Sequence, residues 1–158
     1  ASSSSLSPSQ SLSAPSQIST LGKLAAHGVR LKPSYQVDGL FTFPSGYAAA
    51  EQLLRLPGRD FTALFCANDV MAMAAILCFT RAGLRVPQDL SVIGYDDSML
   101  MAFTDPPLTT LRQSVHAMGT AAVQALMDEI NGTPAPRDEF MFRPELIVRN
   151  STGAAPQR

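Results

Sequence analysis

Cysteine, histidine and clustered basic residues are scarce in this sequence, and each scarcity argues against a class of function. The 158 residues include two cysteines and two histidines, and the histidines, His27 and His116, lie far apart along the chain. No metal-binding or phosphate-binding motif is present, so neither a metal nor a cofactor is expected. The 12 lysines and arginines form no cluster and the formal net charge is −1. This segment therefore lacks the basic surface with which a protein holds nucleic acid by itself.

Long apolar runs and secretion signals are also lacking. The longest apolar run, VMAMAAILCF, is about half as long as a segment that spans a bilayer. The opening stretch ASSSSLSPSQSLSAPSQ has neither the basic start nor the apolar middle of a signal peptide. Cys66 and Cys78 stand among apolar neighbours, as reduced thiols of a protein core do. These features predict a cytoplasmic protein.

The composition that remains is that of one folded domain. The chain is 46% hydrophobic and 16% charged, and its length suits a single domain of about 100–200 residues. Residues 1–19 are rich in serine and proline and are expected to be linker-like or disordered, because they cannot bury enough apolar surface. Residues 20–153 are expected to form the folded domain, followed by a tail at 154–158.

Apolar patterning in the folded part predicts alternating strands and helices. Strands are expected at 35–41, 61–67, 90–95 and 108–113, with an extended segment at 139–151. The strand at 61–67 is a continuous apolar run, typical of burial on both faces. Helices are expected at 21–27, at 46–56 behind a Ser45 cap, at 69–81 and at 115–131 behind a Ser114 cap. This alternation predicts an α/β fold with a parallel sheet flanked by helices.

The helix at 69–81 is apolar around nearly its whole circumference, so it must be covered on two sides. The sheet covers one side, and either a neighbouring subunit or a second internal layer covers the other. The loop SMLMAF that follows the strand at 90–95 is also apolar enough for a subunit contact. The residues expected at a homodimer interface are Met71, Ala75, Cys78, Met99, Met101 and Phe103.

Polar and aromatic residues stand where three predicted strands end. Ligands of open parallel sheets bind beyond the carboxyl ends of the strands, so Phe41, Asn68 and Asp96 are candidates for binding a small polar ligand. Each also has a plain structural alternative. Asn68 or Asp69 can cap the next helix, Asp96 or Asp97 can begin a turn, and Phe41 can belong to the core.

Catalysis is not expected from these residues. The side chains of adjacent Asp96 and Asp97 diverge in a strand, which suits paired acid–base chemistry poorly. The stretch FPSGY does not form a nucleophile elbow. The sequence therefore favours a binding protein over an enzyme.

Three motifs in order, CANDVMA, GLRVPQDLSVIGYDD and PPLTTLRQ, resemble the effector-binding core of lactose-repressor/galactose-repressor (LacI/GalR) transcription regulators. The resemblance runs from about Leu24 to Gly153. It implies a periplasmic-binding-protein-like fold in which Asn68 and Asp96 hydrogen-bond the effector, Phe41 stacks on it and Gln113 lies beside the cleft. It also implies that Asp69 is a helix cap and that the effector is a sugar, or a purine or nucleoside.

The chain departs from this family in what it includes. Family members begin with a helix-turn-helix domain, a hinge helix and an N-terminal subdomain, so DNA binding is expected only through a domain that these 158 residues do not contain. An effector-contacting arginine of the family falls on Ser16. The helix at 115–131 belongs by resemblance to the other subdomain, so it is expected to pack on a second chain or to be mobile.

Two functions share this fold. One is the sensing half of a transcriptional repressor, and the other is a sugar-binding protein of a transport system. The absence of an export signal and the apolar loop SMLMAF favour the repressor.

Overall fold

The structure is a computed structural model that describes residues 31–134 and 140–156. The expectations for residues 1–19, for a helix at 21–27 and for Ser16 lie outside the described residues. The chain divides into two units, Ala1–Val37 and Asp38–Arg158.

The first unit has one described element, the short 3-10 helix η1 (Pro33–Tyr35), which begins with proline. The strand expected at 35–41 is wrong, because no residue between 36 and 40 belongs to a strand. Gln36 has extended dihedral angles, φ −99° and ψ 117°. No described strand pairs with this segment, so alternating side chains alone did not make it a strand.

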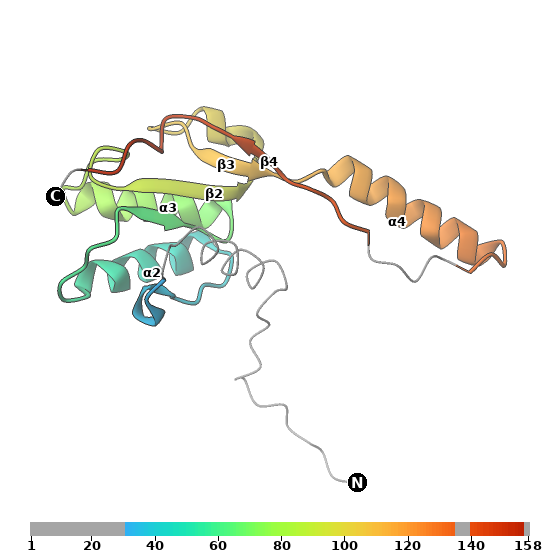
Figure 1. Cartoon of the computed structure of the whole chain (residues 1–158), viewed down its shortest axis with the longest axis horizontal. Coiled ribbons are helices and arrows are strands. Elements are labelled where there is room, and N and C mark those ends of the chain that lie inside the picture. Colours follow the sequence, from blue (N-terminus) through green and yellow to red (C-terminus); the bar gives the residue numbers. More distant parts are fainter. Residues whose placement is uncertain (1–30, 135–139, 157–158) are drawn as a thin grey trace, which may run out of the picture. The chain divides into compact units, whose positions relative to one another are not determined.

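A four-stranded sheet forms the centre of the second unit (Figure 1). Its strands are β1 (Ala63–Phe65), β2 (Ser91–Asp96), β3 (Thr109–Arg112) and β4 (Glu145–Ile147), in that order across the sheet. β1, β2 and β3 are parallel, and β4 runs antiparallel to β3. The expected α/β class with a mostly parallel sheet is confirmed.

The first strand is shorter and less buried than its apolar sequence suggests. β1 has three residues where 61–67 was expected, and Ala63 and Phe65 are exposed. Ala63 and Phe65 point to the same face of the sheet, so burial on both faces is wrong. In the described sheet β1 is also the end strand, with β2 as its neighbour. An apolar run does not reveal whether its strand is central or at an edge.

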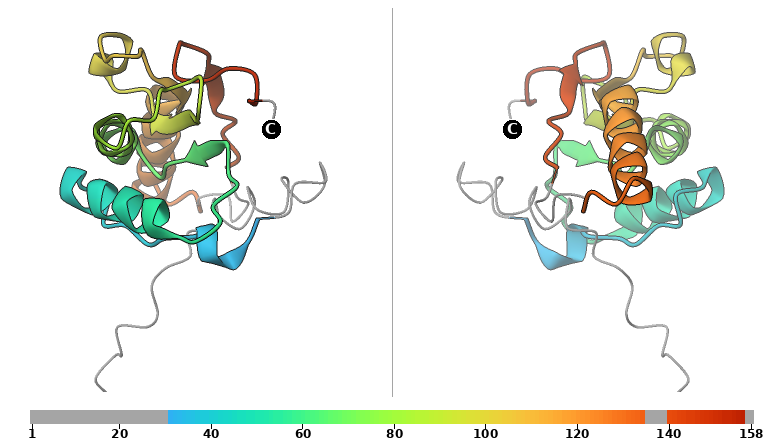
Figure 2. Two further views of the ribbon diagram at one scale, coloured as in Figure 1. Left: turned by 90° about the vertical axis from the view of Figure 1, so that its left-hand side faces the viewer. Right: turned by 90° about the vertical axis from the view of Figure 1, so that its right-hand side faces the viewer.

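Helices α2 (Phe43–Arg55) and α3 (Asp69–Arg81) pack against each other, and α3 also packs against β2 (Figure 2). The cap of α2 is Thr42 and not Ser45 as expected. The Thr42 hydroxyl accepts from the Ser45 backbone N–H, while the Ser45 hydroxyl oxygen accepts from the Thr42 N–H, which makes a reciprocal capping box. α3 ends before Gly83, whose φ of +83° ordinary residues avoid.

An internal layer covers α3 on its second side. Ala72, Ala74 and Phe79 have no exposed surface, and β2 contributes the fully buried Val92. α2 provides the cover, because Gly46 lets its backbone approach Met71 so closely that an added Cβ would lie 2.6 Å from the Met71 Cα. The second of the two alternatives for this helix, an internal layer, is therefore the one the fold contains.

This packing changes the expected subunit contact. Four members of that set are buried within this chain: Met71, Ala75, Cys78 and Met101. With 2–7% of their surface exposed, these four residues offer little area to a second chain in this conformation. Met99 begins the short 3-10 helix η2 (Met99–Ala102) and Phe103 directly follows it, and they are 87% and 82% exposed.

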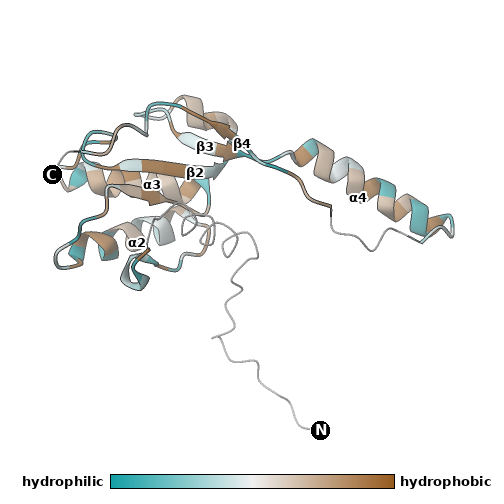
Figure 3. Ribbon diagram, in the orientation of Figure 1, coloured by the Kyte–Doolittle hydropathy of each residue, from teal (hydrophilic) through white to brown (hydrophobic). Residues whose placement is uncertain are grey.

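The long helix α4 (Val115–Ile130) has no buried residue. Ser114 stands at its N-cap position as expected, but its side chain makes no capping hydrogen bond. Figure 3 shows apolar residues spread along the helix, and the exposed ones include Val115, Val123, Leu126 and Ile130. Each such side chain gains about 1.5–3 kcal/mol when it is buried, and the expectation that α4 packs on a second chain or is mobile stays a prediction.

No helix in the described part of the chain is both long enough and apolar enough to cross a membrane.

Candidate functional site

The parallel register brings the expected ligand-binding residues of β1, β2 and β3 to one edge of the sheet. Phe65 pairs with Ile93, and Asn68 and Asp96 each follow three residues after this pair. Asp96 in turn pairs with Arg112, and Gln113 is the next residue. The carboxyl ends of these three strands therefore carry an amide, a carboxylate and a second amide side by side in the strand order.

Asn68 joins two segments at this edge. Its Oδ1 accepts from the backbone N–H of Met71 at 2.9 Å, so Asn68 is the cap of α3. Its Nδ2 donates to the Phe41 carbonyl oxygen at 3.0 Å. Asn68 thus holds Phe41 at the edge, and one amide N–H and one lone pair of Asn68 remain for a ligand.

Phe41 is an exposed ring and not a core residue, because 58% of its surface is accessible. An exposed aromatic ring beside an amide offers an apolar face to a ligand ring.

The Asp96 carboxylate is exposed and is held by Gln113, whose Nε2 donates to Asp96 Oδ1 at 2.6 Å. Among the described residues Gln113 is the one hydrogen-bond partner of this carboxylate, so Oδ2 has free acceptor capacity. A carboxylate offers acceptors only, which suits hydroxyl or N–H groups of a ligand.

Backbone strain marks the same residues. Among residues 31–134 and 140–156, three non-glycine residues have positive φ: Phe41 at 57°, Asp96 at 111° and Asp97 at 55°. Such conformations cost on the order of 1–3 kcal/mol each and persist where the surrounding structure holds them, often at binding sites. Asp96 ends β2, and residues 97 and 98 lead into the next element at Met99 without a turn of their own, so the expectation that Asp96 or Asp97 begins a turn is not confirmed.

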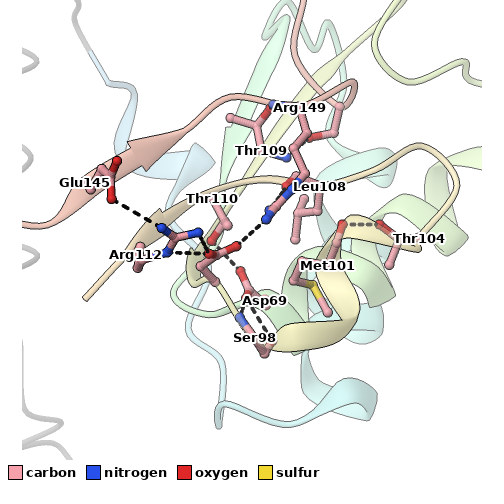
Figure 4. A network of polar contacts seen from close by, with 12 residues as sticks. Asp69, Ser98, Met101, Thr104, Leu108, Thr109, Thr110, Arg112, Glu145 and Arg149 are labelled. Carbon is pink, nitrogen blue, oxygen red and sulfur yellow. Dashed lines mark hydrogen bonds and ion pairs between the residues drawn. The ribbon is translucent and has the colours of Figure 1, made fainter. Parts of the chain in front are cut away.

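Asp97 points into a cluster of arginines. Arg149 Nη2 donates to its Oδ1 at 2.6 Å and Arg112 Nε donates to its Oδ2 at 2.7 Å. Burial acts to raise the pKa of Asp97, but the hydrogen bonds and charges of Arg149 and Arg112 outweigh it and lower the pKa below its ordinary value. Asp97 is therefore ionised at neutral pH, and its charge is matched by two guanidinium groups (Figure 4).

Asp69 is a buried carboxylate and not the helix cap that was expected. It accepts from the Thr110 hydroxyl at 2.5 Å, from the Ser98 backbone N–H at 2.7 Å and from the Ser98 hydroxyl at 2.9 Å. The missing side chain of Gly94 makes room for it, because a Cβ there would collide with Asp69 Oδ1. Asp69 thus links the start of α3 to β3 and to Ser98, the second residue after β2.

Three residues around this edge escaped the sequence analysis as site residues: Asp69, Arg112 and Arg149. One signal for Arg112 was available, because two acids end β2 and a basic residue ends the strand expected beside it. Arg149 lies 52 residues from its carboxylate partner, and no local pattern predicts such a pair.

Among the described residues no three histidine, cysteine, aspartate or glutamate side chains are placed to hold a metal ion. Burial, with a smaller contribution from the charge of Asp69, raises the pKa of the Cys66 thiol to about 12. Cys66 is therefore a protonated core thiol at neutral pH and is not a nucleophile.

Comparison with known proteins gives consistent matches. Residues 8–152 match the family model described as a periplasmic binding protein-like domain. The HTH-type transcriptional regulator MalR of Streptomyces coelicolor is 58% identical over 117 residues, which cover 74% of this chain and 33% of that protein. The HTH-type transcriptional repressor CytR of Escherichia coli is 43% identical over 129 residues, which cover 82% of this chain and 38% of that protein.

Solved structures agree with these relatives. A complex of the transcriptional regulator CelR with cellobiose superposes with a TM-score of 0.76 at 35% identity, covering 82% of this chain and 39% of that one. The Escherichia coli transcriptional repressor ascG gives a TM-score of 0.76 at 32% identity, covering 91% of this chain and 53% of that one. The chain spans about a third of the length of the curated relatives it matches.

Proposed function

The chain belongs to the LacI/GalR family of transcriptional regulators, and from this membership we propose that it is the ligand-sensing part of a repressor. A small effector binds at the carboxyl edge of β1, β2 and β3 and shifts the conformational equilibrium of the whole protein. That shift changes operator binding by a DNA-binding domain in another part of the protein. The observation that carries this proposal is the common edge shared by Asn68, Asp96 and Gln113.

The groups at this edge support a hydroxylated or heterocyclic effector. Asp96 accepts from hydroxyl or ring N–H groups, Asn68 both donates and accepts, and the exposed ring of Phe41 covers one face of the ligand. Cellobiose is the ligand in the CelR complex. A sugar is therefore the first effector class proposed, and a nucleoside or purine is the second.

A thermal-shift titration of the full-length protein tests this function. The panel is glucose, maltose, cellobiose, adenosine, cytidine and hypoxanthine. A true effector is expected to raise the unfolding free energy by about 2.7 kcal/mol when its concentration is 100 times its dissociation constant. The same compound should change operator affinity in a gel-shift assay. A compound that stabilises the protein and leaves operator affinity unchanged would favour the transport alternative, and no stabilisation by any sugar or purine would contradict the proposed effector classes.

Transport is the weaker alternative because MalR and CytR, to which the chain is similar, are named a transcriptional regulator and a transcriptional repressor. We further propose that the chain has no catalytic activity and that the protein acts in the cytoplasm. The engagement of Asp97 by two arginines supports the first point, since it leaves Asp96 without a second carboxylate for acid–base work.

A homodimer is proposed through an apolar patch on η2, defined by Met99, Leu100 and Phe103. These side chains are exposed while their neighbour Met101 is buried and anchors η2 to the core. A cluster of large exposed apolar side chains on a short, anchored helix is typical of a protein contact.

Charging this patch is expected to dissociate the dimer. The double variant Met99→Lys, Phe103→Lys places two ammonium groups in the proposed contact, where like charges and lost apolar burial both oppose association. Sedimentation of the full-length protein should give a dimer for the unmodified protein and a monomer for the variant. Met141→Lys is the matched control, because Met141 is equally exposed but lies outside the patch, and it should remain dimeric. A dimer in all three proteins would contradict this contact.

A further inference from the structure

We propose that Arg112 and Arg149 are positioning residues of the effector site, which hold Asp97 and thereby fix the backbone that presents Asp96. This inference rests on the proposed function, because it assigns the two arginines a task at the same edge. Neither arginine is one of the proposed ligand-binding residues Phe41, Asn68 and Asp96, and both act through Asp97.

The contacts of Asp97 support the inference first. Its side chain is 6% exposed and accepts from guanidinium groups on both oxygens. Arg149 is mostly buried, and its Nη1 donates to the Leu108 carbonyl oxygen at 2.8 Å. Arg112 lies on β3, and its Nη1 reaches Glu145 Oε2 on β4 at 3.4 Å. Strand β3 and the segment that follows β4 thus each contribute one arginine that holds this carboxylate.

The contacts of Asp97 offset the cost of a strained backbone. Asp96 and Asp97 both have positive φ, and such conformations persist where neighbouring residues hold them. The arginines fix the side chain of Asp97, and Asp69 fixes the next residue by accepting from both the N–H and the hydroxyl of Ser98. Asp96 itself has a neutral partner in Gln113. The two residues that follow Asp96 are therefore held by charged partners, while the carboxylate of Asp96 itself remains accessible.

The two adjacent acids also differ in the charge of their partners. Two neighbouring carboxylates repel each other, and the cost is lowest when one of them is neutralised by the protein. Arg112 and Arg149 neutralise Asp97, while Asp96 faces Gln113, which carries no charge. One carboxylate thus serves the fold, and its neighbour stays accessible for the effector.

The test measures amide hydrogen exchange at Ser98 in the full-length protein without any ligand. Arg149→Met keeps most of the side-chain length and removes the charge, and we expect exchange of the Ser98 amide to rise about tenfold. Arg149→Lys should restore much of the protection, because the ammonium group still pairs with Asp97. The matched control is Arg85→Met, which breaks an exposed arginine–aspartate pair, Arg85–Asp89 at 2.7 Å, elsewhere on the surface. It should leave Ser98 exchange unchanged.

Unchanged Ser98 exchange in Arg149→Met would overturn the inference. If this variant fails to fold, the half-exposed Arg112 provides the second test through Arg112→Met, with the same expected direction. Cellobiose affinity of the Asp96→Ala variant separates the two proposals. Increased exchange in Arg149→Met together with unchanged cellobiose binding in Asp96→Ala would reject the effector site and leave the arginines a hold on Asp97 that serves the fold alone. The opposite pair of results would reject the positioning role alone.

Discussion

Replacing Asp96 by alanine is expected to lower effector affinity of the full-length protein by about 100-fold or more, with little change in its stability without effector. A hydrogen bond to a charged group contributes about 1.5–3 kcal/mol, and one carboxylate can accept two from neighbouring hydroxyls. Losing both costs at least about 3 kcal/mol, which corresponds to about 100-fold in dissociation constant. The fold loses little, because Asp96 is exposed and its one described partner is the side chain of Gln113.

The backbone at Asp96 requires a second variant. Its φ of 111° is strained for alanine, so Asp96→Ala alone does not separate the loss of the carboxylate from a change of the backbone. Glycine adopts this φ freely, and Asp96→Gly removes the carboxylate without adding strain. Isothermal titration with the effector found in the thermal-shift panel should give the same large loss for both variants. Normal affinity in Asp96→Gly would show that the carboxylate does not bind the effector.

Elements with strong local signals were predictable from the sequence. β2 and β3 lie within a residue or two of their expected bounds, and α3 begins at Asp69 and ends at Arg81 as expected. The reason is local chemistry. Asn68 supplies the cap hydrogen bond at the start of α3, and Gly83 takes the left-handed conformation after its end. Such signals depend on residues a few positions apart, so the sequence displays them directly.

Strands at 35–41 and 61–67 were less predictable because a strand exists only with its partner. The first segment has the alternation of a strand but no described ladder, and the second keeps three residues in β1. Pairing joins residues distant in sequence, such as Phe65 with Ile93. Alternation reports what a strand would bury and does not report whether a neighbour is present.

The same limit applies to the site. The common edge of Asn68 and Asp96 follows from parallel pairing, which the order of strands and helices predicts. The role of Asp69 depends on Thr110, 41 residues away. Whether Met71 meets a second chain or α2 could not be decided either, because a helix that is apolar all round fits both. Sequence patterns therefore located the edge and the two acids but not the groups that hold them.

Replacing Asp69 by alanine is expected to lower the unfolding free energy of the full-length protein by about 3–5 kcal/mol. The side chain is 1% exposed and accepts three hydrogen bonds, from the Thr110 hydroxyl and from the N–H and hydroxyl of Ser98. The fully buried Thr110 hydroxyl costs about 1–3 kcal/mol when it is left without an acceptor, and each hydrogen bond from Ser98 to the charged carboxylate contributes about 1.5–3 kcal/mol. Urea unfolding measures the loss, and Glu51→Ala is the control, because Glu51 belongs to an exposed pair with Arg55, joined by one contact at 3.3 Å, that contributes little.

Asparagine at position 69 separates the hydrogen bonds from the charge. Asp69→Asn keeps the shape and one acceptor oxygen, but it places an amide NH₂ toward either Thr110 or Ser98, so at least one contact changes from accepting to donating. A loss of stability between those of the unmodified protein and Asp69→Ala is expected. Ser98 directly follows Asp96 and Asp97, so the asparagine variant should also bind effector more weakly than its loss of folding stability alone explains. Equal stability of Asp69→Ala and Glu51→Ala would contradict the buried role of Asp69 and, with it, the support that Ser98 receives from α3.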